Sequence, residues 1–194
     1  MYFLRKIYDW TLKKSNHPRA TWFLAIISFA ESSFFPIPPD IILIPMAIAN
    51  RLKAWTYAFI CTLSSVAGGV FGYFIGYFFF NSIGILIVSY YSLENQFSSF
   101  ESYYKEFGFW IVLGAGFTPF PFKFITIASG LFNLNIILFI LVSLLARGSR
   151  FFLLAGLIKL FGEYIIKFID KYFNLLAIIF FILLIGSFFI IKYL

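Results

Sequence analysis

The feature that most constrains the fold is a polar, proline-rich break at Glu31–Asp40, which interrupts an otherwise apolar stretch. It holds two carboxylates and three prolines, Pro36, Pro38 and Pro39. A proline inside a helix removes a backbone donor and clashes with the preceding turn, so one continuous helix cannot form here. Broken backbone at membrane depth is tolerated only inside protein or beside a wet cavity, and carboxylates at that depth indicate function.

The composition is that of a polytopic membrane protein. Of 194 residues, 62% are hydrophobic and 12% are charged, and the mean hydropathy is +0.94. The net charge of +7 does not indicate nucleic-acid binding, because no basic stripe with interleaved aromatics stands in polar sequence. The lone Cys61 excludes an internal disulfide, and the lone His17 lies in a polar segment. We therefore expect no metal and no cofactor in the membrane.

The two arms around the break, Thr21–Phe35 and Asp40–Ala49, are each too short to cross a hydrocarbon core of roughly 30 Å. Residues 21–49 could form a kinked helix that crosses once, or a re-entrant hairpin that returns to its own side. Three prolines favour the hairpin, whereas one would have favoured a kink. Asp40 could also cap the second arm.

Residues 108–131 repeat this pattern and predict a second hairpin. Pro119, Pro121 and Lys123 separate two short apolar arms, and Gly130 lies in the second arm. Glycine and proline at these positions are expected to shape the hairpin rather than to react.

A long helix is predicted after each hairpin, at 54–80 and 134–161. The first carries glycines at four-residue spacing on one face, where another helix can approach closely: Gly68, Gly72 and Gly76. The second carries Arg147 and Arg150 on one face near its centre. Splitting it at the arginines would leave halves too short to span.

The remaining segments are expected at the membrane surface and at the C-terminus. Residues 1–20 predict an amphipathic helix, either interfacial or covering the bundle end. A second interfacial helix is predicted before residue 108, with an apolar stripe of Leu93, Phe97, Phe100, Tyr104 and Phe107. Residues 162–194 predict a connector and a final transmembrane helix.

The predicted fold is all-α, with an inverted repeat of two re-entrant hairpins, each followed by a long helix, within a membrane domain at 21–161. If the N-terminus is cytoplasmic, most basic residues outside the membrane fall on that side: Arg5, Lys6, Lys13, Lys14, Arg19, Arg51, Lys53, Lys159, Lys167 and Lys171. Only Lys105 and Lys192 fall opposite, so the positive-inside rule is satisfied. The two breaks would meet near the midplane.

Five charges then lie at membrane depth and form the candidate substrate or proton site: Glu31, Asp40, Lys123, Arg147 and Arg150. Their excess positive charge suits an anion, because arginine binds phosphate or carboxylate bidentately. An apolar site favours the neutral form of a carboxyl group, so Glu31 or Asp40 could exchange protons. The alternatives are a static ion-pair network and a lysine that extends to the interface.

These motifs resemble those of the DedA family of bacterial inner-membrane proteins, also called the VTT or SNARE-associated Golgi protein family, and its YqaA-like branch in particular. The resemblance covers about residues 20–160 and rests on Glu31 with Phe34–Asp40, on Gly116–Lys123 with Ala128–Gly130, and on Arg147–Phe151. It implies two re-entrant hairpins facing each other. It also implies transport of phospholipids or polyprenyl phosphate carriers, driven in several members by proton-motive force, with Glu31, Asp40, Arg147 and Arg150 essential.

The function expected is therefore a flippase or scramblase for phosphate-bearing lipids in the bacterial inner membrane, with protons as a candidate coupling ion. The alternative is a small-solute or ion transporter that uses the same site, and a third class is a scaffold for envelope assembly. An enzyme is not expected, because a rhomboid-like site would need a histidine in the membrane and the usual aspartyl-protease motifs are missing. The oligomeric state is left open, a homo-oligomer included.

Overall fold

The computed structural model describes residues 20–35, 37–90, 94–118, 120–162 and 164, and this part of the chain is helical between short connections. The elements are α2 (Ala20–Ser33), α3 (Asp40–Ala49), the 3-10 turn η1 (Arg51–Lys53), α4 (Ala54–Phe79), the π-helical turn η2 (Phe80–Gly84), α5 (Ile85–Tyr90), α6 (Glu94–Phe117), α7 (Phe122–Leu131) and a last helix, Ile136–Gly162. The predicted helical class is confirmed for these residues. The helix expected in 1–20 and the connector and final helix expected in 162–194 lie outside the described residues, apart from Ala20, Gly162 and Tyr164.

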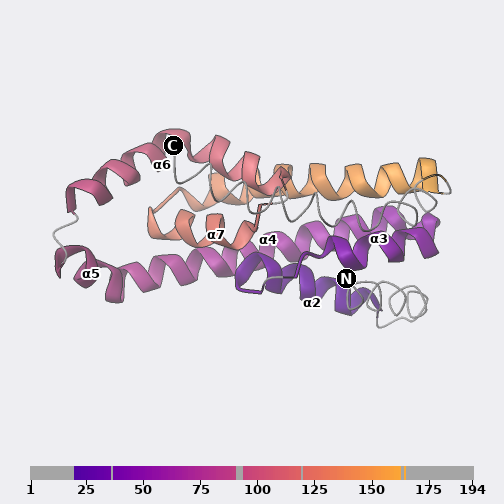
Figure 1. The fold of residues 1–194 in the computed structure, drawn as a ribbon, viewed down its shortest axis with the longest axis horizontal. Coiled ribbons are helices and arrows are strands. Elements are labelled where there is room, and N and C mark those ends of the chain that lie inside the picture. The colour runs from indigo at the N-terminus through magenta and orange to yellow at the C-terminus, as the bar shows by residue number, and fades with distance from the viewer. Residues whose placement is uncertain (1–19, 36, 91–93, 119, 163, 165–194) are drawn as a thin grey trace.

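Among the described residues, two helices are long and apolar enough to cross a membrane, Arg51–Phe79 and Ile136–Gly162. They lie along the length of the molecule, as Figure 1 shows, and run in opposite directions. Trp55, at the start of α4, stacks on Phe152 late in the last helix, whereas Ser65 contacts Arg147 near the middle of both. The last helix passes through both arginines without interruption, so the single predicted helix is confirmed.

α2 runs parallel to α4 and packs closely against it. Ser28 Oγ donates to the Cys61 carbonyl at 2.8 Å, and Ser33 Oγ donates to the Gly68 carbonyl at 2.9 Å. Contacts that advance together along two helices require the same direction. α2 therefore begins at the end of the molecule where α4 begins, and its last turn reaches the middle of α4.

α3 returns toward the start of α4. The chain passes from α3 to α4 through η1, whose N-cap Asn50 accepts a hydrogen bond from the Lys53 backbone N–H. α3 begins at Asp40, beside Arg150 near the middle of the last helix, and ends next to the start of α4, so α3 and α4 run in opposite directions. α2 and α3 thus reverse the chain around residues 34–39, where the prolines were expected to break it.

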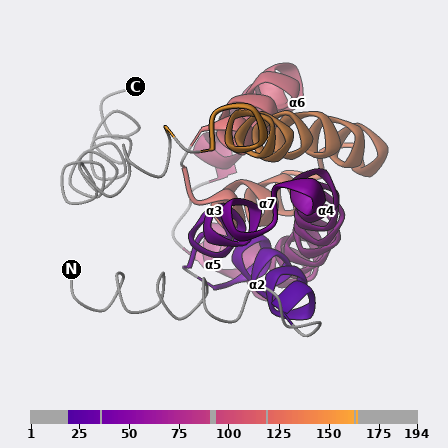
Figure 2. The same ribbon diagram turned by 90° about the vertical axis from the view of Figure 1, so that its right-hand side faces the viewer.

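α7 also runs parallel to α4, and α6 runs against it. Thr126 lies beside Gly72, and Leu131 lies beside Gly76. Tyr104 Oη bonds Ser129 Oγ at 3.0 Å, while the C-terminal part of α6 lies beside the start of α7. The chain therefore reverses again around residues 118–121, from the opposite end of α4. Figure 2 shows α3, α7 and α2 gathered beside α4 in the end view.

The interior is layered along the bundle. One apolar cluster lies where α4 begins and includes Leu24, Met46, Cys61, Phe151 and Ile158. A second lies toward the other end and includes Tyr73, Tyr104, Val112, Phe122 and Phe139. Between them, along both long helices, lie buried polar side chains: Glu31, Ser32, Ser33, Ser65, Thr126 and Arg147. The short helices α2 and α7 supply Glu31, Ser32, Ser33 and Thr126 to this layer, and the two long helices supply Ser65 and Arg147.

One region differs from the sequence prediction. α6 is continuous from Glu94 to Phe117, so the expected interfacial helix and the first arm of the second break are one helix. Gly108 does not interrupt it, since an isolated glycine lowers helix stability without stopping a helix. Within the expected apolar stripe, Tyr104 is buried in the bundle, whereas Phe100 and Phe107 are 65% and 45% exposed.

Candidate functional site

The most buried part of the site is the ion pair between Glu31 of α2 and Arg147 of the last helix. Arg147 NH2 donates to Glu31 Oε2 at 2.5 Å, and the two side chains are 2% and 8% exposed. The guanidinium carbon also lies 5.1 Å from the ring centroid of Phe122 and 4.8 Å from that of Phe151. Aromatic rings attract a cation, most strongly where water is excluded. Arg147 is therefore held by charge and by packing together.

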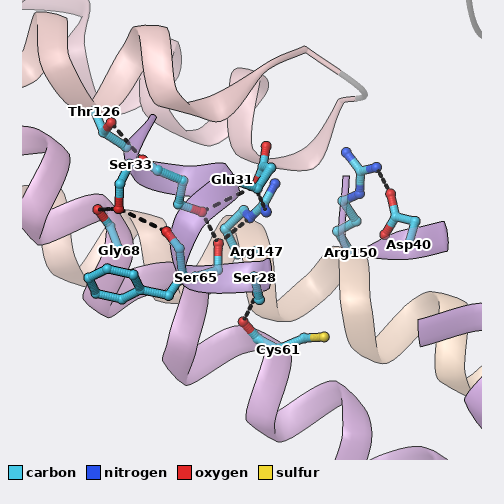
Figure 3. Close-up of polar contacts among 12 residues, drawn as sticks. Ser28, Glu31, Ser33, Asp40, Cys61, Ser65, Gly68, Thr126, Arg147 and Arg150 are labelled. Carbon is cyan, nitrogen blue, oxygen red and sulfur yellow. Dashed lines mark hydrogen bonds and ion pairs between the residues drawn. The ribbon is translucent and has the colours of Figure 1, made fainter. Parts of the chain in front are cut away.

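Two serines close a ring of hydrogen bonds around this pair, shown in part in Figure 3. Arg147 Nε donates to Ser65 Oγ at 2.7 Å. The Ser65 hydroxyl can then donate to Ser32 Oγ at 2.6 Å, and Ser32 donates to Glu31 Oε2 at 3.2 Å. Arg147 donates twice, Glu31 Oε2 accepts twice and each serine hydroxyl can do both, so the ring satisfies its buried polar groups, as such a network requires.

The second ion pair joins Asp40 to Arg150, and it is more open. Arg150 NH2 donates to Asp40 Oδ2, and NH1 donates to the Thr118 carbonyl. The two side chains are 14% and 15% exposed. Asp40 opens α3 and Thr118 follows α6, so a single guanidinium bridges the two breaks of the chain. Asp40 Oδ1 is buried and has no hydrogen-bond partner among the described residues.

Lys123 lies beside the same junction, in the first turn of α7 rather than in the break itself. Its Nζ donates to the Phe34 carbonyl at 3.5 Å and lies 5.5 Å from the ring centroid of Phe124. No carboxylate of the described residues is within ion-pair distance of it. With two carboxylates against three cations, the site carries an excess of positive charge.

The prolines start the returning helices. Pro39 is the N-cap of α3, and Pro121 is the N-cap of α7. No side chain caps α3, so Asp40 does not take the capping role that was one of its two expected roles. Pro38 lies in the first connection, while Pro36 and Pro119 are outside the described residues.

Four glycines lie where helices touch backbone to backbone or nearly so: Gly68, Gly72, Gly76 and Gly130. A Cβ at Gly68 would lie 2.1 Å from the Phe29 carbonyl oxygen, and one at Gly130 would lie 1.8 Å from that of Tyr73. Only glycine allows such an approach without moving a helix. These contacts set how closely α2 and α7 pack against α4.

The sequence did not predict the hydrogen-bond ring of the serines, the aromatic side chains that pack on Arg147, or one further contact. Thr126 Oγ1 of α7 donates to the Ser32 carbonyl of α2 at 2.9 Å, which ties the two broken units together. The available signal was the isolated hydroxyls within apolar helices, which need partners when buried. Which partners they find is decided by residues far away in the chain.

The part of the chain that the structure describes holds no group of three or more His, Cys, Asp or Glu side chains that could bind a metal ion. The chemistry available in the site is therefore that of two carboxylates, two guanidinium groups, one ammonium group and hydroxyls. These groups can bind an anion and can transfer protons.

Two helices long and apolar enough to cross a membrane, with a layer of paired charges beside them, indicate a helical membrane protein with a polar centre. Residues 37–160 match the model of the VTT domain family. The chain is 34% identical over 157 residues to an uncharacterized protein of Haemophilus influenzae, which covers 81% of each chain. It is 35% identical over 157 residues to an uncharacterized homologue from Histophilus somni, which covers 81% of this chain and 82% of the relative. No solved structure matches the chain.

The chain therefore belongs to the VTT domain family, as its resemblance to the DedA/VTT family predicted. The matched region includes Asp40, Lys123, Arg147 and Arg150, and it begins six residues after Glu31. The family is membrane-associated, which agrees with the two helices long enough to span.

Proposed function

We propose that the chain moves phosphate-bearing lipids, such as phospholipids or polyprenyl phosphate carriers, between the leaflets of a bacterial inner membrane, as a flippase or scramblase. The observation that carries this proposal is the junction of the two broken helices near the middle of both long helices. Three cations meet two carboxylates there. Arginine and lysine both bind phosphate, the first as a fork and the second as a point charge.

We infer that α2–α3 and α6–α7 are re-entrant hairpins that enter the membrane from opposite sides, in an inverted repeat. Their helix directions support this, because α2 and α7 run with α4 while α3 and α6 run against it. α2 and α3 have 14 and 10 residues, or about 21 and 15 Å, so neither crosses roughly 30 Å of hydrocarbon.

The charges at the two ends support a cytoplasmic N-terminus. Arg51, Lys53 and Lys159 lie where α4 begins, and Lys159 lies 5.6 Å from the Trp55 ring centroid. At the other end, Lys105 pairs with Glu101 at 2.7 Å. Basic residues concentrate on the cytoplasmic side of membrane proteins. The start of α4 is therefore proposed to face the cytoplasm.

Exposed aromatic rings favour a lipid over a small solute as the transported molecule. Phe34, Phe35 and Phe117, which flank the two breaks, are 60%, 38% and 50% exposed. Apolar side chains beside a charged centre suit a molecule whose headgroup is polar and whose tails stay in the bilayer. A small-solute transporter using the same site would not need them.

We further propose that the site binds and releases its ligand without covalent chemistry, and that Glu31 or Asp40 is the acid that would couple transport to protons. Both acids pair with arginines, so release of either pair would expose a carboxylate able to take a proton.

The direct test is lipid movement in liposomes that contain the purified full-length chain. Fluorescent phospholipids and a fluorescent polyprenyl phosphate are added to all leaflets, and an impermeant quencher reports the fraction that reaches the outer leaflet, with and without a pH gradient. We expect quenching beyond the outer-leaflet half for wild type and for Lys105→Gln, and loss of movement in Arg150→Gln. Acceleration by a pH gradient indicates a coupled flippase, and equal rates indicate a scramblase.

Wild-type liposomes that move no lipid under any gradient would refute lipid transport. Movement by Arg150→Gln at the wild-type rate would refute the assignment of the site.

A further inference from the structure

The two ion pairs at the centre differ in how accessible their arginines are to a ligand. Arg147 is 2% exposed, and its contacts are a carboxylate, a serine and two aromatic rings. An anion could bind Arg147 only after the hydrogen-bond ring and the ring packing had come apart. Because every step of that opening breaks a buried contact, the Glu31–Arg147 pair is better suited to hold the fold than to exchange ligands.

Arg150 is placed differently. It is partly exposed, and its two contacts are Asp40 and the Thr118 carbonyl, one from each break. Asp40 offers only one of its two oxygens, since Oδ1 has no partner among the described residues. Asp40 therefore contacts through one oxygen a guanidinium that could bind an anion through two.

Lys123 completes this outer group. It spans the same junction from α7 to the end of α2, and its contact is a backbone carbonyl at the limit of hydrogen-bond distance, 3.5 Å. A cation near an apolar core without a carboxylate nearby favours an anionic partner. Lys123 ties one break to the other through the Phe34 carbonyl, and Arg150 does so through the Thr118 carbonyl and the Asp40 carboxylate.

We propose that Lys123 and Arg150 form the binding subsite for a phosphate group, and that Asp40 is the internal competitor which the phosphate displaces from Arg150. The Glu31–Arg147 pair takes no part in binding the phosphate and positions the last helix. This deepens the lipid-transport proposal and rests on it for the source of the phosphate. When the phosphate leaves, Asp40 returns to Arg150, so the carboxylate both preserves the empty site and promotes release.

Competition gives Asp40 an effect that a merely structural residue would not have. Replacing it by the isosteric, neutral Asn should weaken the competitor and so strengthen phosphate binding. A residue needed only for stability would lower thermal stability and leave binding unchanged or weaker. Lys123 is partly exposed, so Lys123→Gln should fold normally and lose affinity.

The experiment measures thermal stabilisation of the detergent-solubilised full chain as each of three probes is titrated. The probes are dioctanoyl phosphatidic acid, inorganic phosphate, and uncharged dioctanoylglycerol. The proteins are wild type, Asp40→Asn, Lys123→Gln and the matched surface control Lys105→Gln, whose side chain pairs with Glu101 away from the site.

We expect the phosphatidic acid to stabilise wild type and the surface control equally. The phosphatidic acid concentration that gives half-maximal stabilisation should be about tenfold lower in Asp40→Asn and about tenfold higher in Lys123→Gln. One ionic hydrogen bond gained or lost would give a shift of this size. Stabilisation by inorganic phosphate with the same order of variants would place recognition in the phosphate group itself. A response confined to the lipid would show that the acyl chains are also required.

Binding by Asp40→Asn that equals or falls below wild type would overturn the competitor role. Wild-type affinity in Lys123→Gln, or equal stabilisation by uncharged dioctanoylglycerol, would overturn the subsite. These results are separate from those of the transport assay. If the chain moves lipid but does not show the expected binding changes, the proposed function stands and the subsite is refuted. If the binding changes are seen but no lipid moves, only the subsite stands.

Discussion

The two halves of the described chain share an architecture and differ in charge. Residues 20–90 form two short helices around a break and then a long helix. Residues 94–162 form the 24-residue α6 and the short α7 around a break and then a long helix. Both site carboxylates, Glu31 and Asp40, belong to the first half. All three site cations belong to the second half, where Lys123 opens α7 and the two arginines lie in the last helix.

This segregation means that neither half can satisfy its own buried charges. A buried carboxylate or guanidinium without a partner costs several kcal/mol, so each half depends on the other to fold. A buried ion pair contributes little net stability relative to apolar packing. We infer that the charges fix which surfaces of the two halves meet and at what depth, while the glycine contacts supply close packing.

The largest effect is expected from leaving one half with an uncompensated charge. Arg147→Leu removes the partner of Glu31 and should lower the free energy of unfolding by about 3–5 kcal/mol. Denaturant unfolding in detergent measures it. The double variant Glu31→Leu/Arg147→Leu should recover most of this loss, because no buried charge then remains. A single variant as stable as wild type would show that the halves do not depend on this pair.

A large effect is also expected where the halves touch through glycine. In Gly76→Ala the new Cβ would lie 2.0 Å from the Ile127 carbonyl oxygen. α7 would have to move away from α4, at a cost of about 1–3 kcal/mol or more. Gly114→Ala is the matched control in α6, because nothing lies within 4 Å of its Cβ. The melting temperatures of the two variants make the comparison, and equal values would contradict the close packing.

An intermediate effect is expected from Ser65→Ala, which removes the acceptor of Arg147 Nε and breaks the serine ring. Leaving that donor unsatisfied should cost about 1–3 kcal/mol. Ser99→Ala, at an exposed serine of α6, should change stability by less than about 0.5 kcal/mol. If the two alanine variants unfold at the same denaturant concentration, the ring contributes nothing to the junction.

The smallest effect is expected at a charge pair that lies within one half and outside the junction. Lys105 and Glu101 form an (i, i+4) pair on α6, with side chains 58% and 29% exposed. Lys105→Gln should cost about 0.3–0.5 kcal/mol. A loss of stability as large as that of Arg147→Leu would show that a charge at the junction matters no more to stability than a charge outside it.

The breaks were predictable because proline acts locally. The sequence placed α3 at Asp40–Ala49, where the structure has it, and kept the last helix unbroken through Arg147 and Arg150. The pairing of the charges was not predictable, since Glu31 and Arg147 are 116 residues apart. Asp40 had two equally open roles until packing placed Arg150 beside it. The continuity of α6 was missed because apolar periodicity alone does not mark where an interfacial helix becomes a buried one.

The most direct test of two halves entering the membrane from opposite sides is cysteine labelling in oriented membrane vesicles. Leu52→Cys marks the start of α4, at a residue that is 88% exposed, and Ser99→Cys marks the other end. The unsubstituted chain is the background, because Cys61 is buried. With an impermeant maleimide, we expect Leu52→Cys to react only in inside-out vesicles and Ser99→Cys only in right-side-out vesicles. Reaction of both from the same side would contradict the opposed halves.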